Sequence, residues 1–391
     1  MLFRDDLKAI GNKAGAKVMA ACGDMVDAVV TVDPAHVGYL CGYRSVLLDV
    51  DRTYRCAVII TRNRTVLVTG ASDAAPALEV MRDPANIYRY GMFYVSMRKS
   101  DVDYEALPKA ENTFVDAMKA AIAATIKPQQ TVGLDGATEA DVQQLKSLIG
   151  NRTVDARPSI IKARSVKLPE EIEKIRYAAS ITERGMEKAL RYAAPGVTEL
   201  ELSAVIANEI RAGGGIPRFV VVTAGQRAAL ADAYATAAKL AKGDLLRLDI
   251  GCTVEGYWAD TARTAVMGAP TREQQERYDA LLEGELAQLA LAKPGITVGD
   301  LFNVAVETVR KGALPNYQRT HCGHGIGIGA HEFPTLNAAN QNVELQEGMV
   351  FCVETPYYEI GWGGMMVEDM IVIRPSGNER LTNLPREMQQ L

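Results

Sequence analysis

Residues 244–267 read DLLRLDIGCTVEGYWADTARTAVM, two apolar stretches that each enclose an aspartate. The turn-like residues 254–256 between them predict a β-hairpin. If the turn is centred between the first two of these residues, Asp249 lies directly opposite Asp260, and facing like charges need a proton or a cation between them. The alternative is that Asp249 caps a strand end and Asp260 pairs with Arg263.

A second pair of acids follows nearer the C-terminus. Residues 348–354 (GMVFCVE) are an apolar run that ends in Glu354, and residues 365–373 (MMVEDMIVI) are a run that encloses Glu368. The two glutamates are symmetric on the glycine-rich turn between the runs. Acids inside apolar strands are costly unless they are paired or bind metal, so two such hairpins indicate a site and not a solvated surface.

Histidine supplies the third element of the pattern. The chain has four histidines, and His321, His324 and His331 fall within one glycine-rich stretch, THCGHGIGIGAHEFP at 320–334. Such clustering favours a functional role, and the glycines allow close approach of a ligand. Four carboxylates and one imidazole suit two divalent cations such as manganese, cobalt, iron or zinc. Two such ions would activate a bridging water and polarise a carbonyl, which is the chemistry of amide hydrolysis.

The rest of the chain predicts two α/β domains. Strands are expected at 26–32, 56–60 and 65–69, and helices at 71–81 and 113–126. A boundary is expected in the polar stretch 155–168, which gives domains 1–160 and 161–391. A proline and two acids at 169–171 predict the start of a long helix that continues through Leu190.

An internal repeat marks the second domain. PGVT at 195–198 recurs as PGIT at 294–297, ninety-nine positions later. Each copy follows one helical pattern, precedes another and then leads into strands that carry acids. The repeat predicts a domain made of duplicated α-β half-domains.

Composition excludes several classes of protein. The 391 residues are 48% hydrophobic and 23% charged, with a formal net charge of −5. A globular protein is expected, with no nucleic-acid partner because a basic footprint is missing, and no membrane span because no apolar run approaches about 18 residues. The N-terminus lacks the apolar core of a secretory signal, and six scattered cysteines indicate reduced thiols, so a cytoplasmic location is expected.

With these motifs the sequence resembles the pita-bread metallopeptidases, namely methionine aminopeptidase, aminopeptidase P and prolidase, with the metal-free creatinase as a relative. Residues 32–42 (VDPAHVGYLCG) resemble the start of the creatinase/prolidase N-terminal domain. The resemblance implies a smaller creatinase-like α/β domain followed by a C-terminal pita-bread domain. It also implies a homodimer in which the neighbour's N-terminal domain lines the active site.

The same resemblance assigns roles to the candidate site residues. It implies that Asp260 and Glu368 bridge two ions and that Glu354 also acts as general base. His331 matches the histidine that contacts the scissile carbonyl or the tetrahedral intermediate. The implied ligands of the two divalent metal ions are Asp249, Asp260, His324, Glu354 and Glu368.

Three positions depart from the family pattern. Asp232 stands where relatives have a histidine that positions substrate and handles protons, and is therefore a candidate catalytic residue of different charge. Met366 stands where aminopeptidase P and prolidase often have an arginine, so a substrate carboxylate would have to be held elsewhere. His321 lies three residues before the ligand histidine instead of four, and receives no role.

Three functions remain in competition. The leading one is a dinuclear metallohydrolase of the Xaa-Pro dipeptidase or aminopeptidase P type, acting on peptides. The second is a small-molecule C–N hydrolase on the same scaffold, as in creatine hydrolysis, which the departures at 232 and 366 favour. The third is a non-catalytic binding module, against which the intact set of five ligands argues.

Overall fold

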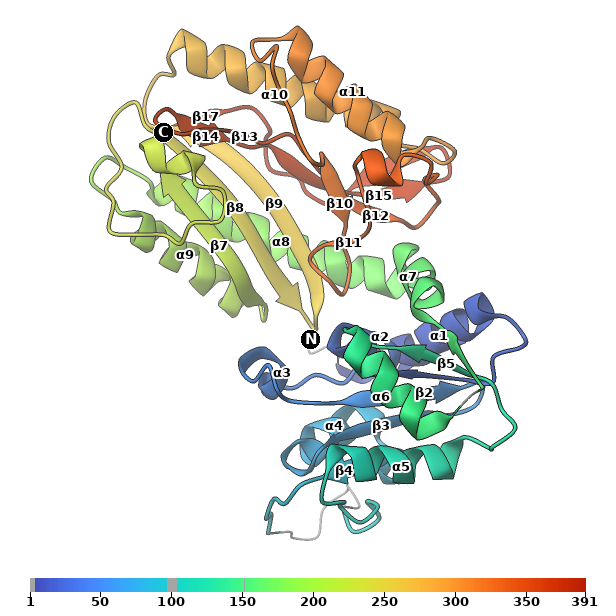
Figure 1. The fold of residues 1–391 in the computed structure, drawn as a ribbon. Coiled ribbons are helices and arrows are strands. Elements are labelled where there is room, and N and C mark those ends of the chain that lie inside the picture. The colour runs from blue at the N-terminus through green and yellow to red at the C-terminus, as the bar shows by residue number, and fades with distance from the viewer. Residues whose placement is uncertain (1–3, 97–103, 151) are drawn as a thin grey trace. The chain divides into compact units, whose positions relative to one another are not determined.

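The computed structural model describes residues 4–96, 104–150 and 152–391 (Figure 1). The chain divides into two compact units, Met1–Arg164 and Ser165–Leu391. Among the described helices, none is both long and apolar enough to cross a lipid bilayer.

The first unit is an α/β layer built on one sheet. Its strands are β1 (Ala28–Thr31), β2 (Ala57–Thr61), β3 (Thr65–Gly70), β4 (Ile87–Tyr90), β5 (Val132–Asp135) and β6 (Thr153–Asp155). Their spatial order is β4-β3-β2-β1-β5-β6, with β1 antiparallel to β2 and parallel to β5. The helices are α1 (Arg4–Cys22), α2 (Pro34–Cys41), α3 (Val46–Val50), α4 (Ala74–Met81), α5 (Phe114–Thr125), α6 (Glu139–Ile149) and α7 (Arg157–Ser165).

A hydrophobic core joins α5 and α6 to this sheet. Met118 and Leu145 from the helices pack with Val30 and Ile59 from the strands, and all four are buried. The strands and helices expected from the sequence in this unit are confirmed, except that the segment 71–81 begins with a short 3₁₀ turn before α4.

The second unit is a curved antiparallel sheet with helices on its outer side (Figure 1). The helices are α8 (Pro169–Tyr192), α9 (Glu199–Ala212), α10 (Arg272–Leu291) and α11 (Val298–Lys311). The main strands are β7 (Ile216–Ala224), β8 (Leu245–Val254), β9 (Tyr257–Val266), β10 (Gly323–Gly325), β11 (Glu332–Thr335), β12 (Val350–Glu354) and β15 (Glu368–Arg374). They lie in the order β11-β10-β12-β15-β9-β8-β7.

Shorter strands complete the unit. A separate two-stranded ribbon pairs β13 (Tyr357–Glu359) with β14 (Gly363–Met365), while β16 (Gly377–Arg380) pairs with β15 and β17 (Gln389–Gln390) pairs with β9. The predicted helix that starts at Pro169 is confirmed as α8.

The predicted duplication is visible in matching local contacts. Thr198 caps the N-terminus of α9 and Thr297 caps α11, each in a reciprocal capping box with the residue three positions on. Just before each cap, Gly196 N–H donates to the carbonyl of Leu240 and Gly295 N–H donates to that of Leu345. The connections within the helix pairs α8–α9 and α10–α11 are thus held in the same way, each by the segment that precedes β8 or β12.

The hairpin β8–β9 differs in register from the sequence-based prediction. Glu255 and Gly256 both have positive φ, 48° and 83°, and together form a two-residue turn. The turn centre lies one position later than expected, because a two-residue turn of this kind needs left-handed backbone at both central positions. Asp249 therefore pairs with Ala262 and not with Asp260. The prediction that the two aspartates face each other directly is wrong. The register of the second hairpin is confirmed, because Glu354 pairs with Glu368.

A cluster of buried charges lies between α10 and the sheet. Arg263 Nη2 and Arg386 Nε each donate to Asp369, at 2.5 Å. Glu285 of α10 is fully buried with its Oε2 3.5 Å from Arg386 Nε. Burial, followed by the charge of Asp369, raises the pKa of Glu285 to about 8 although both arginines oppose the shift.

Replacing Glu285 by glutamine is expected to stabilise the protein more at pH 8 than at pH 5. The folded pKa is raised, so the unfolded chain releases the proton first as the pH rises from the ordinary glutamate range to about 8, and the folded state loses stability across that window. Thermal unfolding should show an advantage of Glu285→Gln over wild type that is larger at pH 8 by roughly 2 °C or more. Glu283→Gln, on the exposed face of the same helix, is the control. Equal advantages of Glu285→Gln at both pH values would contradict the assignment.

Candidate metal centre

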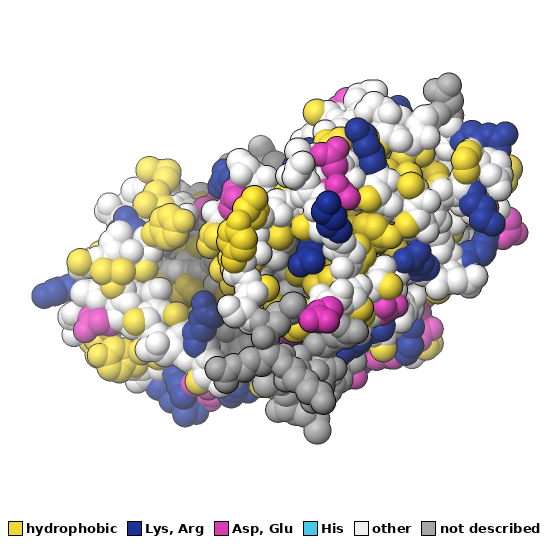
Figure 2. Space-filling view, turned by 90° about the horizontal axis from the view of Figure 1, so that it is seen from below, with side chains coloured by type: hydrophobic (Ala, Val, Ile, Leu, Met, Phe, Trp, Pro, Cys, Tyr) yellow, Lys and Arg dark blue, Asp and Glu magenta, His cyan; other side chains and the backbone are white. Residues whose placement is uncertain are grey.

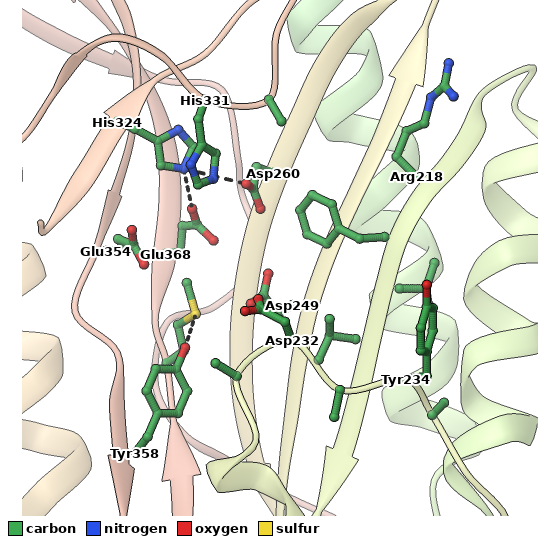
Figure 3. Close-up of a pocket in the computed structure, with 18 of the residues that line it drawn as sticks. Arg218, Asp232, Tyr234, Asp249, Asp260, His324, His331, Glu354, Tyr358 and Glu368 are labelled. Carbon is green, nitrogen blue, oxygen red and sulfur yellow. Dashed lines mark hydrogen bonds and ion pairs between the residues drawn. The ribbon is translucent and has the colours of Figure 1, made fainter. Parts of the chain in front are cut away.

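Five adjacent strands of the second unit deliver the five predicted ligands to one place. The strand order β10-β12-β15-β9-β8 places side by side the segments that carry them. All five line one cavity of about 870 Å³, and Figure 3 shows their side chains converging from the sheet. The residues and strands are His324 on β10, Glu354 on β12, Glu368 on β15, Asp260 on β9 and Asp249 on β8.

Three of these side chains meet closely. His324 Nε2 lies 3.7 Å from Asp260 Oδ2 and 4.0 Å from Glu368 Oε1. With Cys352 Sγ they form a buried group whose ligand atoms all lie within 4.8 Å of one another. Gly323 permits this approach, because a Cβ there would lie 2.2 Å from the carbonyl oxygen of Cys352 and its φ is 127°. A side chain at 323 would push β10, and His324 with it, away from β12.

Asp249 and Glu354 approach from the sides of the cavity. Arg247 Nη1 donates to Asp249 Oδ2 at 3.0 Å. His321 Nδ1 lies 2.9 Å from Glu354 Oε1. Both carboxylates line the same cavity as the other three ligands but lie outside the close group.

The electrostatics of the cluster show excess negative charge. Burial and then the neighbouring carboxylates raise the pKa of Asp260 and of Glu368 well above their usual ranges. Burial raises the pKa of Asp249 to about 6, although Arg247 opposes the shift. Burial lowers the pKa of His324 to about 4, so this imidazole is a neutral ligand at pH 7.

Glu354 behaves differently from the other carboxylates. Burial raises its pKa, but His321, together with His324 and Arg319, outweighs burial and holds the pKa below its usual range. Glu354 is therefore the carboxylate of the set that most readily stays ionised, as a ligand of a cation must be.

The residues fit divalent cations. Asp260 Oδ1 and Glu368 Oε2 are buried and accept no hydrogen bond within the described part of the chain. The alternative ion pair of Asp260 with Arg263 does not form, because Arg263 donates to Asp369 and to backbone carbonyls instead. Oxygen ligands with one imidazole match divalent ions such as manganese, iron, cobalt or zinc.

The other predicted catalytic residues lie at the mouth of the cavity. The His331 ring stacks on that of His324, with centroids 3.8 Å apart and planes at 27°. Asp232 is exposed in the loop that follows the 3₁₀ turn Gly225–Ala229, and its carboxylate points toward Asp249 (Figure 3). Met366 also lines the cavity, where the Tyr358 hydroxyl is 3.8 Å from its sulfur.

Sequence reasoning missed several residues of the site. His321 belongs to the histidine cluster that the sequence displays, yet its spacing alone gave it no role. Cys352 was classed as a core thiol; it is buried, and burial raises its pKa well above its usual range, but it also lies inside the ligand group. Arg319 and Tyr358 line the cavity without any sequence signal that marks them. The fourth histidine, His36, lies in the first unit, 2.6 Å from Asp135.

A duplicated α-β unit with four carboxylates and an imidazole on its sheet defines a metal-dependent hydrolase of the pita-bread class. The comparisons specify the family. Residues 173–375 match the model of metallopeptidase family M24, and residues 16–166 match the creatinase/prolidase N-terminal domain. The chain belongs to metallopeptidase family M24.

Several proteins of known name are similar to the chain. A Xaa-Pro dipeptidase of Pyrococcus furiosus is 31% identical over 67% of this chain and 76% of its own length. A Xaa-Pro dipeptidase of Pyrococcus horikoshii is 27% identical over 88% of this chain and 97% of its own. The crystal structure of an X-Pro aminopeptidase from Thermotoga maritima superposes with a TM-score of 0.78 at 25% identity, covering 97% of this chain and 99% of that one.

Metal loading is expected to give two ions per chain at saturation and to stabilise the protein near pH 7, because cations relieve the repulsion among the buried carboxylates. Elemental analysis after loading with manganese and desalting measures the stoichiometry, and thermal unfolding with and without metal measures the stabilisation. Asp260→Asn should lower the metal content. Asp279→Asn, on the exposed side of α10 and outside the cavity, is the control and should keep it. Wild-type protein that holds no transition metal would refute the site.

Proposed function

We propose that the protein is a dinuclear-metal hydrolase of the Xaa-Pro dipeptidase or aminopeptidase P type. The observation that carries the proposal is the convergence of four carboxylates, three of them buried, and a neutral imidazole on one cavity large enough for a short peptide. The similarity to two named Xaa-Pro dipeptidases supports the same activity. Hydrolysis of Ala-Pro with and without added manganese tests it.

The placement of the side chains supports the proposed ligand roles. Asp249, Asp260, His324, Glu354 and Glu368 would hold two divalent ions, manganese, cobalt, iron or zinc. Ions held there supply Lewis acidity toward a carbonyl and lower the pKa of water. Asp260 and Glu368 would be shared by both ions, because they belong with His324 to one group of close ligand atoms.

The chain's own groups then handle the protons and the substrate. Glu354 accepts the proton of the attacking water, and His321, 2.9 Å from Glu354 Oε1, orients this carboxylate. His331 reaches over the mouth of the cavity, where an imidazole N–H can donate to the carbonyl oxygen of the substrate as charge develops on it.

A second candidate function is hydrolysis of a C–N bond in a small cationic molecule. Asp232 favours it, because the loop places a carboxylate beside the cavity where a cationic group of a substrate would be attracted. Met366 favours it too, because a thioether cannot hold a peptide carboxylate. Small amidines and betaines, assayed beside Ala-Pro, distinguish the two candidates.

We further infer a cytoplasmic homodimer. Five of the six cysteines are buried and all six are free thiols, which suits a reducing compartment. Large apolar side chains of the first unit are exposed, among them Val46, Val50, Met92 and Tyr94. Hydrophobic side chains also surface in several places on the face drawn in Figure 2. Such exposure supports a covering partner, and light scattering of the full chain measures the stoichiometry.

Glu354→Gln is expected to abolish turnover while leaving the fold intact. The amide keeps the shape of the side chain but cannot accept the proton, so the rate should fall by orders of magnitude. Steady-state kinetics on Ala-Pro, with circular dichroism as the check on folding, measure the effect. Glu359→Gln, on β13 and outside the cavity, is the control. A Glu354→Gln variant with more than about a tenth of wild-type activity would contradict the role, since a decade is only ~1.4 kcal/mol of barrier.

Asp232→His is expected to improve cleavage of Xaa-Pro dipeptides and to weaken any activity on cationic molecules. The carboxylate repels the anionic end of a short peptide and attracts a cationic group, and an imidazole removes both effects. Asp232→Ala should harm the cationic substrate more than the peptide. The ratio of kcat/KM values for the two substrates measures the change, with Asp279→Ala on the exposed side of α10 as the control. Unchanged ratios in both variants would show that Asp232 has no part in selectivity.

A further inference from the structure

Arg247 connects the metal site to one wall of the cavity. It lies on β8 two residues before Asp249, and its side chain is fully buried, with 0% exposure. The wall in question belongs to the loop 228–235, which begins at the end of the 3₁₀ turn; its residues 231–235, among them Asp232 and Tyr234, line the cavity. Burying an arginine costs free energy unless its N–H groups have hydrogen-bond partners. The partners of Arg247 therefore indicate what this side chain does in the fold.

Four hydrogen bonds from this guanidinium account for its burial. Nε donates to the carbonyl of Ala228 at 3.1 Å, and Nη2 donates to those of Leu230 at 2.9 Å and Ala231 at 2.6 Å. Nη1 donates to Asp249 Oδ2 at 3.0 Å. The planar guanidinium thus binds three loop carbonyls and the Asp249 carboxylate at once and fixes their relative positions. The ammonium group of a lysine is a single point on a flexible chain and cannot make the same set of hydrogen bonds.

The ends of the same loop are held by a second buried charge. Glu199 of α9, with 0% exposure, accepts from Ala224 N–H and from Thr236 N–H, both at 2.9 Å. Between these ends the loop makes few backbone–backbone hydrogen bonds. One of them, from Ala233 N–H to the carbonyl of Leu230, is long at 3.4 Å. Arg227 Nη2 donates to the carbonyl of Tyr234 at 3.0 Å, so the part of the loop that depends on Arg247 is the stretch 228–231, directly before Asp232.

We propose that Arg247 is a positioning residue that fixes the Asp232 loop against Asp249 and so sets the selectivity of the cavity. The guanidinium converts the loop into a preformed wall whose carboxylate stands at a set distance from the metal ligands. The positional part of the proposal stands on the contacts alone. The selectivity part rests on the proposed hydrolase function.

Hydrogen exchange tests the positional part without any need for activity. The full chain loaded with manganese is compared as wild type, Arg247→Lys and Arg247→Met. Amides of 230–235 are expected to exchange roughly tenfold faster in Arg247→Met and by an intermediate factor in Arg247→Lys, with α8 and the first unit unchanged. If Arg247→Met does not fold, Arg247→Lys decides.

Arg263→Lys is the matched control for this experiment. Arg263 is a buried arginine on the neighbouring strand β9 that also donates to several backbone carbonyls, but it has no contact with the loop. Its replacement should leave exchange at 230–235 unchanged. Unchanged exchange at 230–235 in both Arg247 variants, or faster exchange spread evenly over the second unit, would overturn the proposal.

A double-mutant cycle tests the selectivity part. In Arg247→Lys, KM for Ala-Pro, or for a cationic molecule that the wild type hydrolyses, should change by roughly tenfold, with a smaller change in kcat. The metal content should stay at the wild-type value. In the Asp232→Ala background the same substitution should leave KM unchanged, because the group that Arg247 positions is gone. Additive effects would overturn this part. Wild-type protein that hydrolyses none of these substrates would instead refute the proposed function, and the exchange result would still decide the role of Arg247.

Discussion

Negative charge buried in an apolar sheet is the constraint on which the second unit depends. Glu368 and Asp369 are consecutive on β15 and point to opposite faces of the sheet, as successive strand residues must. On one face Asp369 receives hydrogen bonds from Arg263 and Arg386, and although burial raises its pKa, these arginines hold it below its usual range. On the other face Glu368 meets more carboxylates and its pKa is raised. This second face therefore carries excess negative charge, which suits it to bind divalent cations.

The duplication explains where that face lies. The first half contributes Asp249 and Asp260 on β8 and β9, and the second half contributes Glu354 and Glu368 on β12 and β15. The two halves join where β15 pairs with β9, at Glu368 and Ala262. Each hairpin alone would expose its two acidic side chains on one face of a two-stranded sheet. When the two hairpins join, all four acidic side chains line one cavity. The helix pairs cover the outer face of the sheet and leave the inner face for the cavity.

The sequence predicted the parts of this site that local patterns determine. The pairing of Glu354 with Glu368 was predicted correctly, because the glycine-rich turn lies between the two residues and its first glycine is equally far from both along the sequence. The pairing of Asp249 with Asp260 was not, because the left-handed backbone at Glu255 that shifts the turn is a property of folded geometry. The partnerships of His321 with Glu354 and of Arg247 with the loop carbonyls join segments far apart along the chain. A single sequence carries no signal for such contacts.

The chemical and the selective parts of the cavity are built differently. The proposed ligands lie on strands that are paired on both sides, so their geometry is shared with the whole sheet. Asp232 and Tyr234 lie on a loop that is held by hydrogen bonds from Arg247 and Arg227 and to Glu199. A loop can change its residues without disturbing the strands behind it, so one scaffold can carry sites of different selectivity. The departure at position 232 therefore bears on which molecule enters the cavity, and the intact ligand set bears on what happens to it there.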